Sequence, residues 1–192
     1  MTVGKFVLAS ASPRRVDLLA QIGITPDAIL PADIDEKPLD KELPALYAGR
    51  MAFEKARVVS EQNSDAFILA ADTVVSVGRR ILPKAEDPAT ARACLNLLSG
   101  RRHRVYGGVC LVNPDGKVST RLVQTAVAFK RLEVQEIDTL IESGEWSGKA
   151  GGYAIQGLSE GFIRFINGSY SNVVGLPLFD VRQLLVGARF MT

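Results

Sequence analysis

The stretch AFILAADTVVSV, residues 66–77, is the most continuous apolar run in the chain and decides its fold class. Its many β-branched residues favour a buried central strand, because such side chains pack well on a pleated surface. One carboxylate, Asp72, interrupts the run, and burying a carboxylate is costly unless it is paired, hydrogen-bonded or bound to a metal ion. The alternative is a shorter strand that ends here and leaves the carboxylate in water. We favour a functional role for Asp72, since buried carboxylates often mark functional sites.

Strand-like and helix-like segments alternate on both sides of this stretch. We expect further strands at residues 5–10, 104–113, 117–130 and 162–166, with a hairpin turn at NPDG, residues 113–116. We expect helices to begin near Ser12, Pro44, Asp87, Glu133 and Pro177, three of them ending near Gly23, Gly100 and Gly144. This alternation predicts an α/β or α+β fold with a mixed sheet, in one domain over residues 1–192.

The composition excludes several classes of protein. With 23 Lys and Arg against 21 Asp and Glu, the net charge of +2 leaves no basic surplus for binding nucleic acid through its phosphates. No run approaches the roughly 18 apolar residues of a membrane-spanning helix. Cys94 and Cys110 form neither a zinc motif nor a disulfide scaffold, which indicates a reducing compartment. We therefore expect a soluble cytoplasmic protein without a membrane or nucleic-acid partner, whose one histidine, His103, is structural.

The junction SASPRR, residues 10–15, lies where the first expected strand meets the first expected helix. A helix N-terminus exposes unpaired N–H groups and the positive end of the helix dipole, which suits a phosphate group. The hydroxyls of Ser10 and Ser12 and the guanidinium groups of Arg14 and Arg15 would complete such an anion site. An ordinary capped helix with solvated arginines explains the same residues equally well.

Other charged residues are candidates for a metal or phosphate site. Asp33, Asp35 and Glu36 offer hard oxygen ligands that suit Mg2+ or Mn2+ held partly by substrate phosphates. A solvated acidic loop is the simpler alternative for these three residues. Lys55 and Lys84 are candidates for neutralising a phosphate, against the ordinary expectation that a lysine is surface charge.

Two loops carry an unusual composition. In GKAGGYAIQG, residues 148–157, the density of glycines implies close backbone approach, and Gln156 can recognise a planar hydrogen-bonding edge. The alternative for this loop is a flexible connector. The second loop, INGSYSNVVGLP at residues 166–177, is a polar turn that leads into another helix N-terminus. The sequence has no P-loop, G-x-G-x-x-G turn or nucleophile elbow, which argues against the common ATPase, dinucleotide-binding and serine-hydrolase classes.

These motifs, in this order, resemble those of the Maf nucleotide pyrophosphatases. The matching runs are LASASPRR at 8–15, EKA at 54–56, ADTVV at 71–75, LSG at 98–100, and residues 149–157 and 166–178. Together they span nearly the whole chain. The sequence departs from the family pattern at two places. Pro83 and Ala85 flank Lys84 where Lys-Pro is more usual, and Gly107 stands where Thr is usual.

The resemblance implies an enzyme that uses a divalent metal ion to hydrolyse nucleoside triphosphates to the monophosphate and pyrophosphate. It implies an elongated mixed sheet with flanking helices, similar to the inosine triphosphate pyrophosphatases, with two lobes around a central cleft, and it allows a homodimer. Asp72 matches the family's catalytic aspartate. The family's phosphate-binding positions match Arg14, Arg15, Lys55 and Lys84. We expect Asp72 to hold Mg2+ or Mn2+ with help from Glu36 and to orient the attacking water.

Residues at three positions distinguish the branches of this family by their substrates. Arg14, Thr73 and Gln156 match the branch that acts on dTTP and UTP, whereas the 7-methyl-GTP branch tends to carry Trp, Gln and Glu there. We expect Gln156 to pair with N3–H and O4 of uracil or thymine, and Thr73 to fill space that a purine needs. The alternatives are a pyrophosphatase for 7-methyl-GTP or modified nucleotides, and a non-catalytic nucleotide-binding regulator of cell division.

Overall fold

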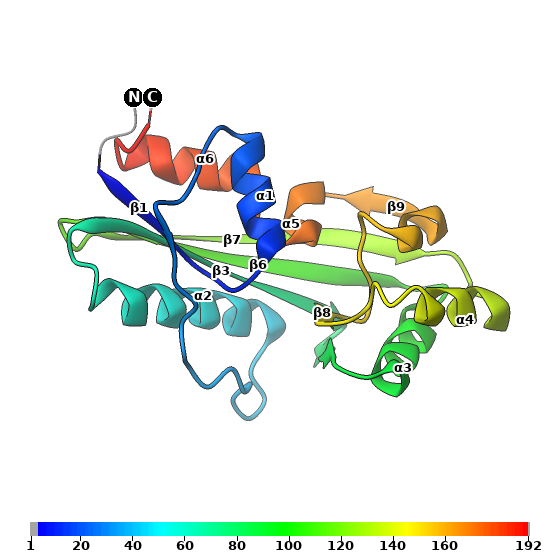
Figure 1. Cartoon of the computed structure of the whole chain (residues 1–192). Helices are drawn as coiled ribbons and strands as arrows, with labels where there is room; N and C mark the ends of the chain where they lie inside the picture. The colour runs from blue at the N-terminus through cyan, green and yellow to red at the C-terminus, as the bar shows by residue number, and fades with distance from the viewer. Residues whose placement is uncertain (1–3, 192) are drawn as a thin grey trace.

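A mixed sheet of seven strands forms the frame of the molecule in the computed structural model, which describes residues 4–191 (Figure 1). The strand order is β2-β1-β3-β6-β7-β9, and β4 pairs with β3. The strands are β1 Lys5–Ala9, β2 Ala28–Ile29, β3 Ala66–Val77, β4 Arg80–Ile81, β6 Arg102–Val112, β7 Val118–Phe129 and β9 Ile163–Asn167. Strand β1 is parallel to β2 and β3, and the other pairs are antiparallel, so the predicted mixed sheet is confirmed.

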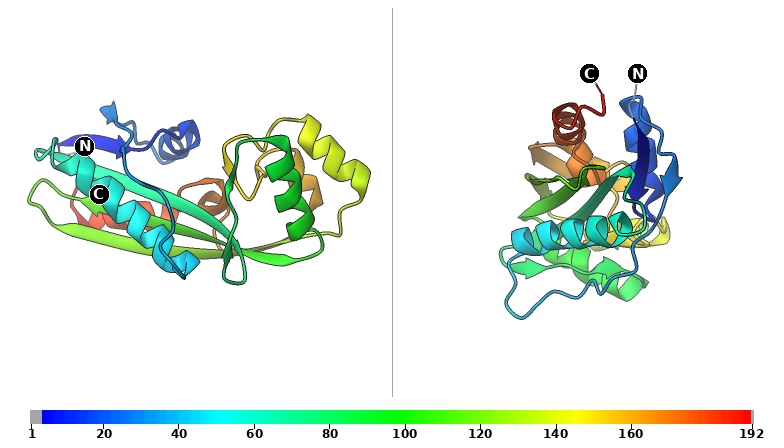
Figure 2. Two further views of the ribbon diagram at one scale, coloured as in Figure 1. Left: turned by 90° about the horizontal axis from the view of Figure 1, so that it is seen from below. Right: turned by 90° about the vertical axis from the view of Figure 1, so that its left-hand side faces the viewer.

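Helices cover the two faces of the sheet unequally along its length. They are α1 Pro13–Gln21, α2 Pro44–Ser60, α3 Pro88–Leu98, α4 Val134–Glu142, α5 Tyr170–Val174 and α6 Leu178–Gly187, with a 3-10 helix η1 Leu158–Phe162. Helix α2 packs on one face, α1 and α6 pack on the opposite face, and α3 and α4 lie at the other end of the long strands (Figures 1 and 2). Within residues 4–191, no helix has the length and apolar character needed to span a bilayer.

The expected elements are present, with small shifts at their ends. The strand expected at 66–77 has those bounds, and the helices expected at Ser12, Asp87 and Glu133 use these residues as N-caps. The first strand ends one residue early, at Ala9. The loop at 166–177 contains the helix α5, whose N-cap Ser169 accepts a hydrogen bond from the Asn172 N–H group, where only a polar turn was expected.

A gap in strand pairing opens one edge of β3. Strand β1 pairs with β3 only as far as Ala70, and β4 pairs with it only from Ser76. Among the described residues, the segment 71–75 has no strand partner on this edge, apart from the Leu82 N–H group that donates to the Val75 carbonyl at 2.8 Å. The other edge pairs continuously with β6. The middle of the central strand is therefore open to a cavity on the β1 side.

A second, two-stranded ladder lies beside this gap. It pairs β5 Lys84–Ala85 with β8 Lys149–Ala150. The chain beyond β8 is anchored to β3 at Gly151, whose φ of +73° is left-handed and where a Cβ would come within 2.8 Å of a Val75 methyl carbon. The flexible-connector alternative for residues 148–157 is therefore wrong.

His103 fixes the same loop from inside the core. Its Nε2 atom lies 2.8 Å from the hydroxyl of Tyr153, and both side chains are buried. The Tyr153 ring also packs edge-on against Phe129, with ring centroids 5.1 Å apart. His103 therefore lies in the core, as expected, and holds the segment that lines the cavity.

Helix α2 approaches the sheet closely at Gly108 of β6. A Cβ at this position would overlap the carbonyl group of Ala48 in α2. Because Lys55 lies on the same helix, the short distance between α2 and the sheet also determines how near the Lys55 ammonium group comes to β3.

We expect Gly108→Ala to lower the free energy of unfolding by about 1–3 kcal/mol, the usual cost of overpacking a core. The matched control is Gly49→Ala in α2, where a Cβ would meet nothing within 4 Å. That control should stabilise the protein by up to about 1 kcal/mol through helix propensity. Urea denaturation followed by circular dichroism measures both changes, and equal effects of the two variants would contradict the packing argument.

Burial lowers the pKa of His103 to about 4 from its ordinary value of 6.5. Above pH 6.5 both the folded and unfolded forms are neutral, so His103 adds no pH dependence there. Between about pH 6.5 and pH 4 only the unfolded form takes up the proton, so the free energy of unfolding decreases as the pH falls. We expect His103→Phe to flatten this dependence in urea denaturation at pH 7.5 and pH 5, and to cost about 1 kcal/mol at pH 7.5 because Tyr153 loses its partner. An unchanged pH dependence would count against the assignment.

Candidate active site

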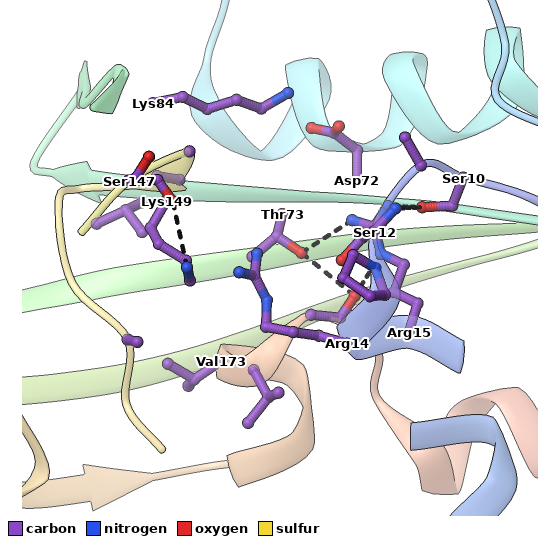
Figure 3. Close-up of a pocket in the computed structure, with 18 of the residues that line it drawn as sticks. Ser10, Ser12, Arg14, Arg15, Asp72, Thr73, Lys84, Ser147, Lys149 and Val173 are labelled. Atoms are coloured by element: carbon purple, nitrogen blue, oxygen red, sulfur yellow. Dashed lines mark hydrogen bonds between the residues drawn. The ribbon is translucent and has the colours of Figure 1, made fainter. Parts of the chain in front are cut away.

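A cavity of about 480 Å³ occupies the gap beside β3 (Figure 3). Its walls come from the β1–α1 junction, the β5–β8 ladder, the loop after β8 and the end of α5. The lining residues are 9–15, 31, 32, 36, 55, 72, 73, 75, 84, 86, 147–150, 153–156 and 173–175. Apart from the metal-ligand candidates Asp33 and Asp35, the residues predicted for catalysis, substrate binding, specificity or metal binding are among them: Ser10, Ser12, Arg14, Arg15, Glu36, Lys55, Asp72, Thr73, Lys84 and Gln156.

Arg15 is a buried cation whose hydrogen-bond partners are all uncharged. Its Nε donates to the Gly175 carbonyl at 2.9 Å, Nη1 donates to Ser10 Oγ at 2.9 Å, and Nη2 donates to Thr73 Oγ1 at 3.3 Å (Figure 3). Burial lowers the pKa of this guanidinium group. The charges of Asp72 and Glu36 oppose this effect, but neither carboxylate forms an ion pair with Arg15 among the described residues. A buried charge without a directly paired carboxylate is costly, so this arrangement favours an anionic ligand. The alternative of solvated arginines is wrong for Arg15.

The serines of the junction hold its backbone in place. Ser10 Oγ accepts from the Ser12 N–H group at 3.1 Å as well as from Arg15. Ser12 is the N-cap of α1, but its side chain makes no capping hydrogen bond. The Ser12 side chain therefore lines the cavity and is not used to cap the helix.

A chain of alternating charges forms the opposite side of the cavity. Lys55 Nζ lies 2.7 Å from Asp72 Oδ1 and 2.8 Å from Glu36 Oε1. Glu36 Oε2 lies in turn 2.7 Å from Lys84 Nζ. Burial acts to raise the pKa of Glu36, but the hydrogen bonds from the two lysines outweigh it and lower the pKa to about 2. Glu36 is thus ionised at neutral pH, and its carboxylate and that of Asp72 contact the same ammonium group.

The carboxylates suit a metal ion that is held largely by substrate. Within residues 4–191, no group of three or more His, Cys, Asp or Glu side chains is arranged to hold a metal ion. Mg2+ is commonly bound by one or two carboxylates together with substrate phosphates, and Asp72 and Glu36, both adjacent to the Lys55 ammonium group, fit that donor set. Asp33 and Asp35 do not line the cavity, and Asp35 accepts a hydrogen bond from the Lys37 N–H group instead.

Thr73 lies between the side of the cavity that carries Arg15 and the side that carries Lys55 and Asp72. Its hydroxyl accepts from Arg15 and donates to the Gly175 carbonyl at 3.4 Å. Because successive residues on a strand point to opposite faces, Thr73 points away from the face that carries Asp72. The exposed Gln156 stands at the cavity wall, on the loop that Tyr153 anchors.

One cavity cation was not among the predicted site residues. Lys149 points from β8 toward Arg14 (Figure 3). Its run, GKAGG, was recognised as a loop with close backbone approach, but the pattern of glycines gave no indication of where the lysine points. Only the pairing of β8 with β5 brings it to the cavity.

Comparisons of the sequence with known proteins identify its relatives. The family model described as Maf-like protein matches residues 5–188. A dTTP/UTP pyrophosphatase from Paramagnetospirillum magneticum is 61% identical over 184 residues, covering 96% of this chain and 97% of its own. One from Caulobacter vibrioides is 61% identical over 181 residues, covering 94% of each chain.

One solved structure is also similar over part of the chain. It is a nucleoside-triphosphatase, dITP/XTP pyrophosphatase, from Mycobacterium abscessus, 18% identical, with a TM-score of 0.45 over 67% of this chain and 74% of that chain. The family assignment depends on the sequence matches alone. Because the family model matches residues 5–188 and the relatives are 61% identical over nearly the full length, the chain belongs to the Maf-like protein family.

Proposed function

We propose that this protein is a nucleoside triphosphate pyrophosphatase that hydrolyses dTTP and UTP to the monophosphate and pyrophosphate. The observation that carries the proposal is one cavity that combines the buried carboxylate Asp72 with five cationic side chains. These are Arg14, Arg15, Lys55, Lys84 and Lys149. Within the described residues, the cavity is lined by three carboxylates in all, Asp72, Glu36 and Glu86, so the five cations still outnumber them. This surplus of positive charge suits a triphosphate, and the activity is the one named for the relatives at 61% identity.

Asp72 is the group that orients the attacking water and accepts its proton. Phosphoryl transfer depends mainly on positioning and on neutralisation of charge, so a carboxylate fixed beside the reacting phosphate is sufficient for this role. Lys55 Nζ donates to Asp72 Oδ1 at 2.7 Å, which fixes the orientation of the carboxylate. Asp72 and Glu36 would hold the Mg2+ or Mn2+ ion that the family suggests, and such an ion supplies neutralisation of phosphate charge.

The cations of the β1–α1 junction and of the β5–β8 ladder bind the triphosphate. Arg15 is held by three hydrogen bonds, and the second N–H of each Nη atom is left for a phosphate oxygen. Preorganised donors of this kind stabilise the charge that develops on a leaving group at little reorganisation cost. Lys84, bound to Glu36 at 2.7 Å, can exchange this partner for a phosphate oxygen.

The base is recognised by Gln156, with Arg14 and Thr73 shaping the site. A glutamine amide has an acceptor for the N3–H group and a donor for O4 of uracil or thymine. The anchored loop supports this assignment because it holds Gln156 at the cavity wall. Thr73 narrows the space between the two sides of the cavity.

The chain forms one domain with two lobes, and hydrolysis takes place between them. One lobe contains α1, α2 and α6, and the other contains α3 and α4 (Figure 2). Support comes from the separate apolar clusters of the two ends and from the long strands β3, β6 and β7 that connect them.

The reaction is tested by pyrophosphate release from dTTP, UTP, CTP, dATP, GTP and 7-methyl-GTP with Mg2+ or Mn2+. We expect the highest kcat/KM for dTTP and UTP, and loss of activity on chelation. Asp72→Asn should lower kcat/KM about 100-fold or more, as expected for a general base, whereas the exposed Asp40→Asn should change nothing. Preference for 7-methyl-GTP would overturn the substrate assignment, and nucleotide binding without release would favour a regulator.

Substrate preference is tested by Gln156→Glu. A carboxylate cannot donate to O4, so we expect kcat/KM for dTTP and UTP to fall about tenfold or more relative to GTP. Gln135→Glu on the exposed face of α4 is the matched control and should leave all ratios unchanged. An unaltered preference in Gln156→Glu would refute its role in base recognition.

A further inference from the structure

The segment that carries Gln156 is a tight turn, 154–157, which the Gly157 N–H group closes by donating to the Ala154 carbonyl at 3.0 Å. Before Gln156 the chain is anchored in the core, because Tyr153 and Ile155 are buried. The Gln156 side chain is exposed, and within residues 4–191 no hydrogen bond holds its amide. The position of this amide at the cavity wall therefore depends on how firmly the backbone of the turn is held.

Glu145 holds the turn on its other side. Its Oε2 atom accepts a hydrogen bond from the Leu158 N–H group at 2.7 Å. Leu158 lies two residues beyond Gln156, whereas Glu145 lies 13 residues before Leu158, in the turn that follows α4. A hydrogen bond from a backbone N–H group to a carboxylate is charge-assisted and is stronger than one between neutral groups. Glu145 therefore supplies a strong tie between the end of α4 and the loop that carries Gln156.

Gly157 allows the carboxylate to come this close. A Cβ at this position would overlap the carboxylate group of Glu145. The φ angle of Gly157 is −111°, which any residue can adopt, so backbone conformation does not require glycine here. The requirement comes instead from the close approach of the side chain to the backbone. The residue directly after Gln156 is thus fitted to Glu145.

Glu145 is itself fixed in place. Its N–H group donates to Ser143 Oγ at 3.2 Å, and the indole of the next residue, Trp146, donates to the Ile141 carbonyl at 2.8 Å. Helix α4, which precedes this turn, packs in the same apolar cluster as Tyr153. The carboxylate therefore extends from a rigid part of the molecule, and it can serve as a fixed point for the loop.

The charge of Glu145 also reaches a cation of the cavity. Burial and the charge of Arg14 lower the pKa of Lys149, and Glu145 opposes both effects. Glu86 lines the cavity as well, but the acidic group that acts on the pKa of Lys149 is Glu145. The two effects of Glu145 differ in their chemistry, because holding Leu158 needs only an acceptor oxygen, whereas acting on Lys149 needs a charge.

We propose that Glu145 is a positioning residue for recognition of the base and that it acts through the backbone of Gln156, an inference that rests on the proposed function. A glutamine amide distinguishes bases by presenting its acceptor and donor at fixed places on the base edge. A displacement of about 1 Å is enough to weaken such a contact. Without Glu145 the turn keeps the Tyr153 anchor alone, and the amide loses its fixed place.

Three variants test this role. Glu145→Ala removes both the acceptor and the charge, and Glu145→Gln keeps an acceptor oxygen but removes the charge. Gly157→Ala displaces the carboxylate from the opposite side of the same contact. For each variant, kcat and KM are measured with dTTP and with GTP, together with the melting temperature and the hydrogen exchange of residues 154–158.

Two matched controls change similar groups away from this contact. Asp27→Ala removes a carboxylate that accepts from the Phe6 N–H group at 2.7 Å and does not line the cavity. Gly161→Ala changes a glycine of the same 3-10 helix η1 where a Cβ would meet nothing within 4 Å. We expect Asp27→Ala to lower the melting temperature, and both controls to keep the wild-type ratio of kcat/KM for dTTP to that for GTP.

For Glu145→Ala we expect this ratio to fall about fivefold, as for loss of one well-placed hydrogen bond. The loss should appear mainly as a higher KM for dTTP, because contacts with the base are the same in the ground state and the transition state. Hydrogen exchange of residues 154–158 should become faster. Gly157→Ala should behave in the same way, and Glu145→Gln should restore most of the ratio.

A residue that acts through Gln156 has no effect on preference once Gln156 is gone. We therefore expect Glu145→Ala to change the ratio less than twofold in a Gln156→Ala background. A glutamate with a merely structural role would lower the melting temperature in both backgrounds and leave the ratio unchanged in the wild-type background.

Three results would overturn the inference while leaving the proposed function intact, all in an enzyme whose wild type prefers dTTP. They are an unchanged ratio in Glu145→Ala, an equal loss in Glu145→Gln and Glu145→Ala, and full additivity with Gln156→Ala. The second of these would assign the effect to the charge that acts on Lys149. A wild type that releases no pyrophosphate from any nucleoside triphosphate would overturn both proposals together.

Discussion

Lys55 and Asp72 are buried against each other between α2 and β3, with nitrogen and oxygen 2.7 Å apart and less than a tenth of either side chain exposed. Neither charge is tolerable there alone, since removing one partner of a buried pair typically costs about 3–5 kcal/mol. The pair explains how the most apolar strand of the chain accommodates a carboxylate at its centre. It also places that carboxylate at the stretch of β3 whose outer edge has no strand partner within residues 4–191.

The same lysine connects the sheet to the loop before α2. Lys55 contacts Glu36 as well as Asp72, and Glu36 contacts Lys84 on β5, so this chain of ion pairs joins four separate segments. The close packing of α2 on Gly108 sets the position of the helix from which Lys55 extends. The packing of α2 on the sheet therefore determines where the Lys55 charge meets the carboxylates of the cavity.

Long elements were predictable from sequence and short ones were not. The predicted bounds of the strand 66–77 agree with those of β3 because its apolar run is continuous. Pro13 and Pro88 indicated where two helices begin, because proline suits the first helical turn. Strands of two residues, such as β5 and β8, have no periodicity to detect. The five-residue helix α5 begins in a polar segment, INGSYSN, whose composition is that of a turn.

The site was predictable as a set of residues but not as a pattern of contacts. The family motifs named nearly all of the charged groups in the cavity, yet they do not say that Lys55 bridges two carboxylates or that Arg15 meets only neutral oxygens. The departure at Gly107 has a physical reason of the same kind, since a Cβ there would overlap the buried side-chain amide of Asn172, whose nitrogen lies 3.1 Å from Thr125 Oγ1.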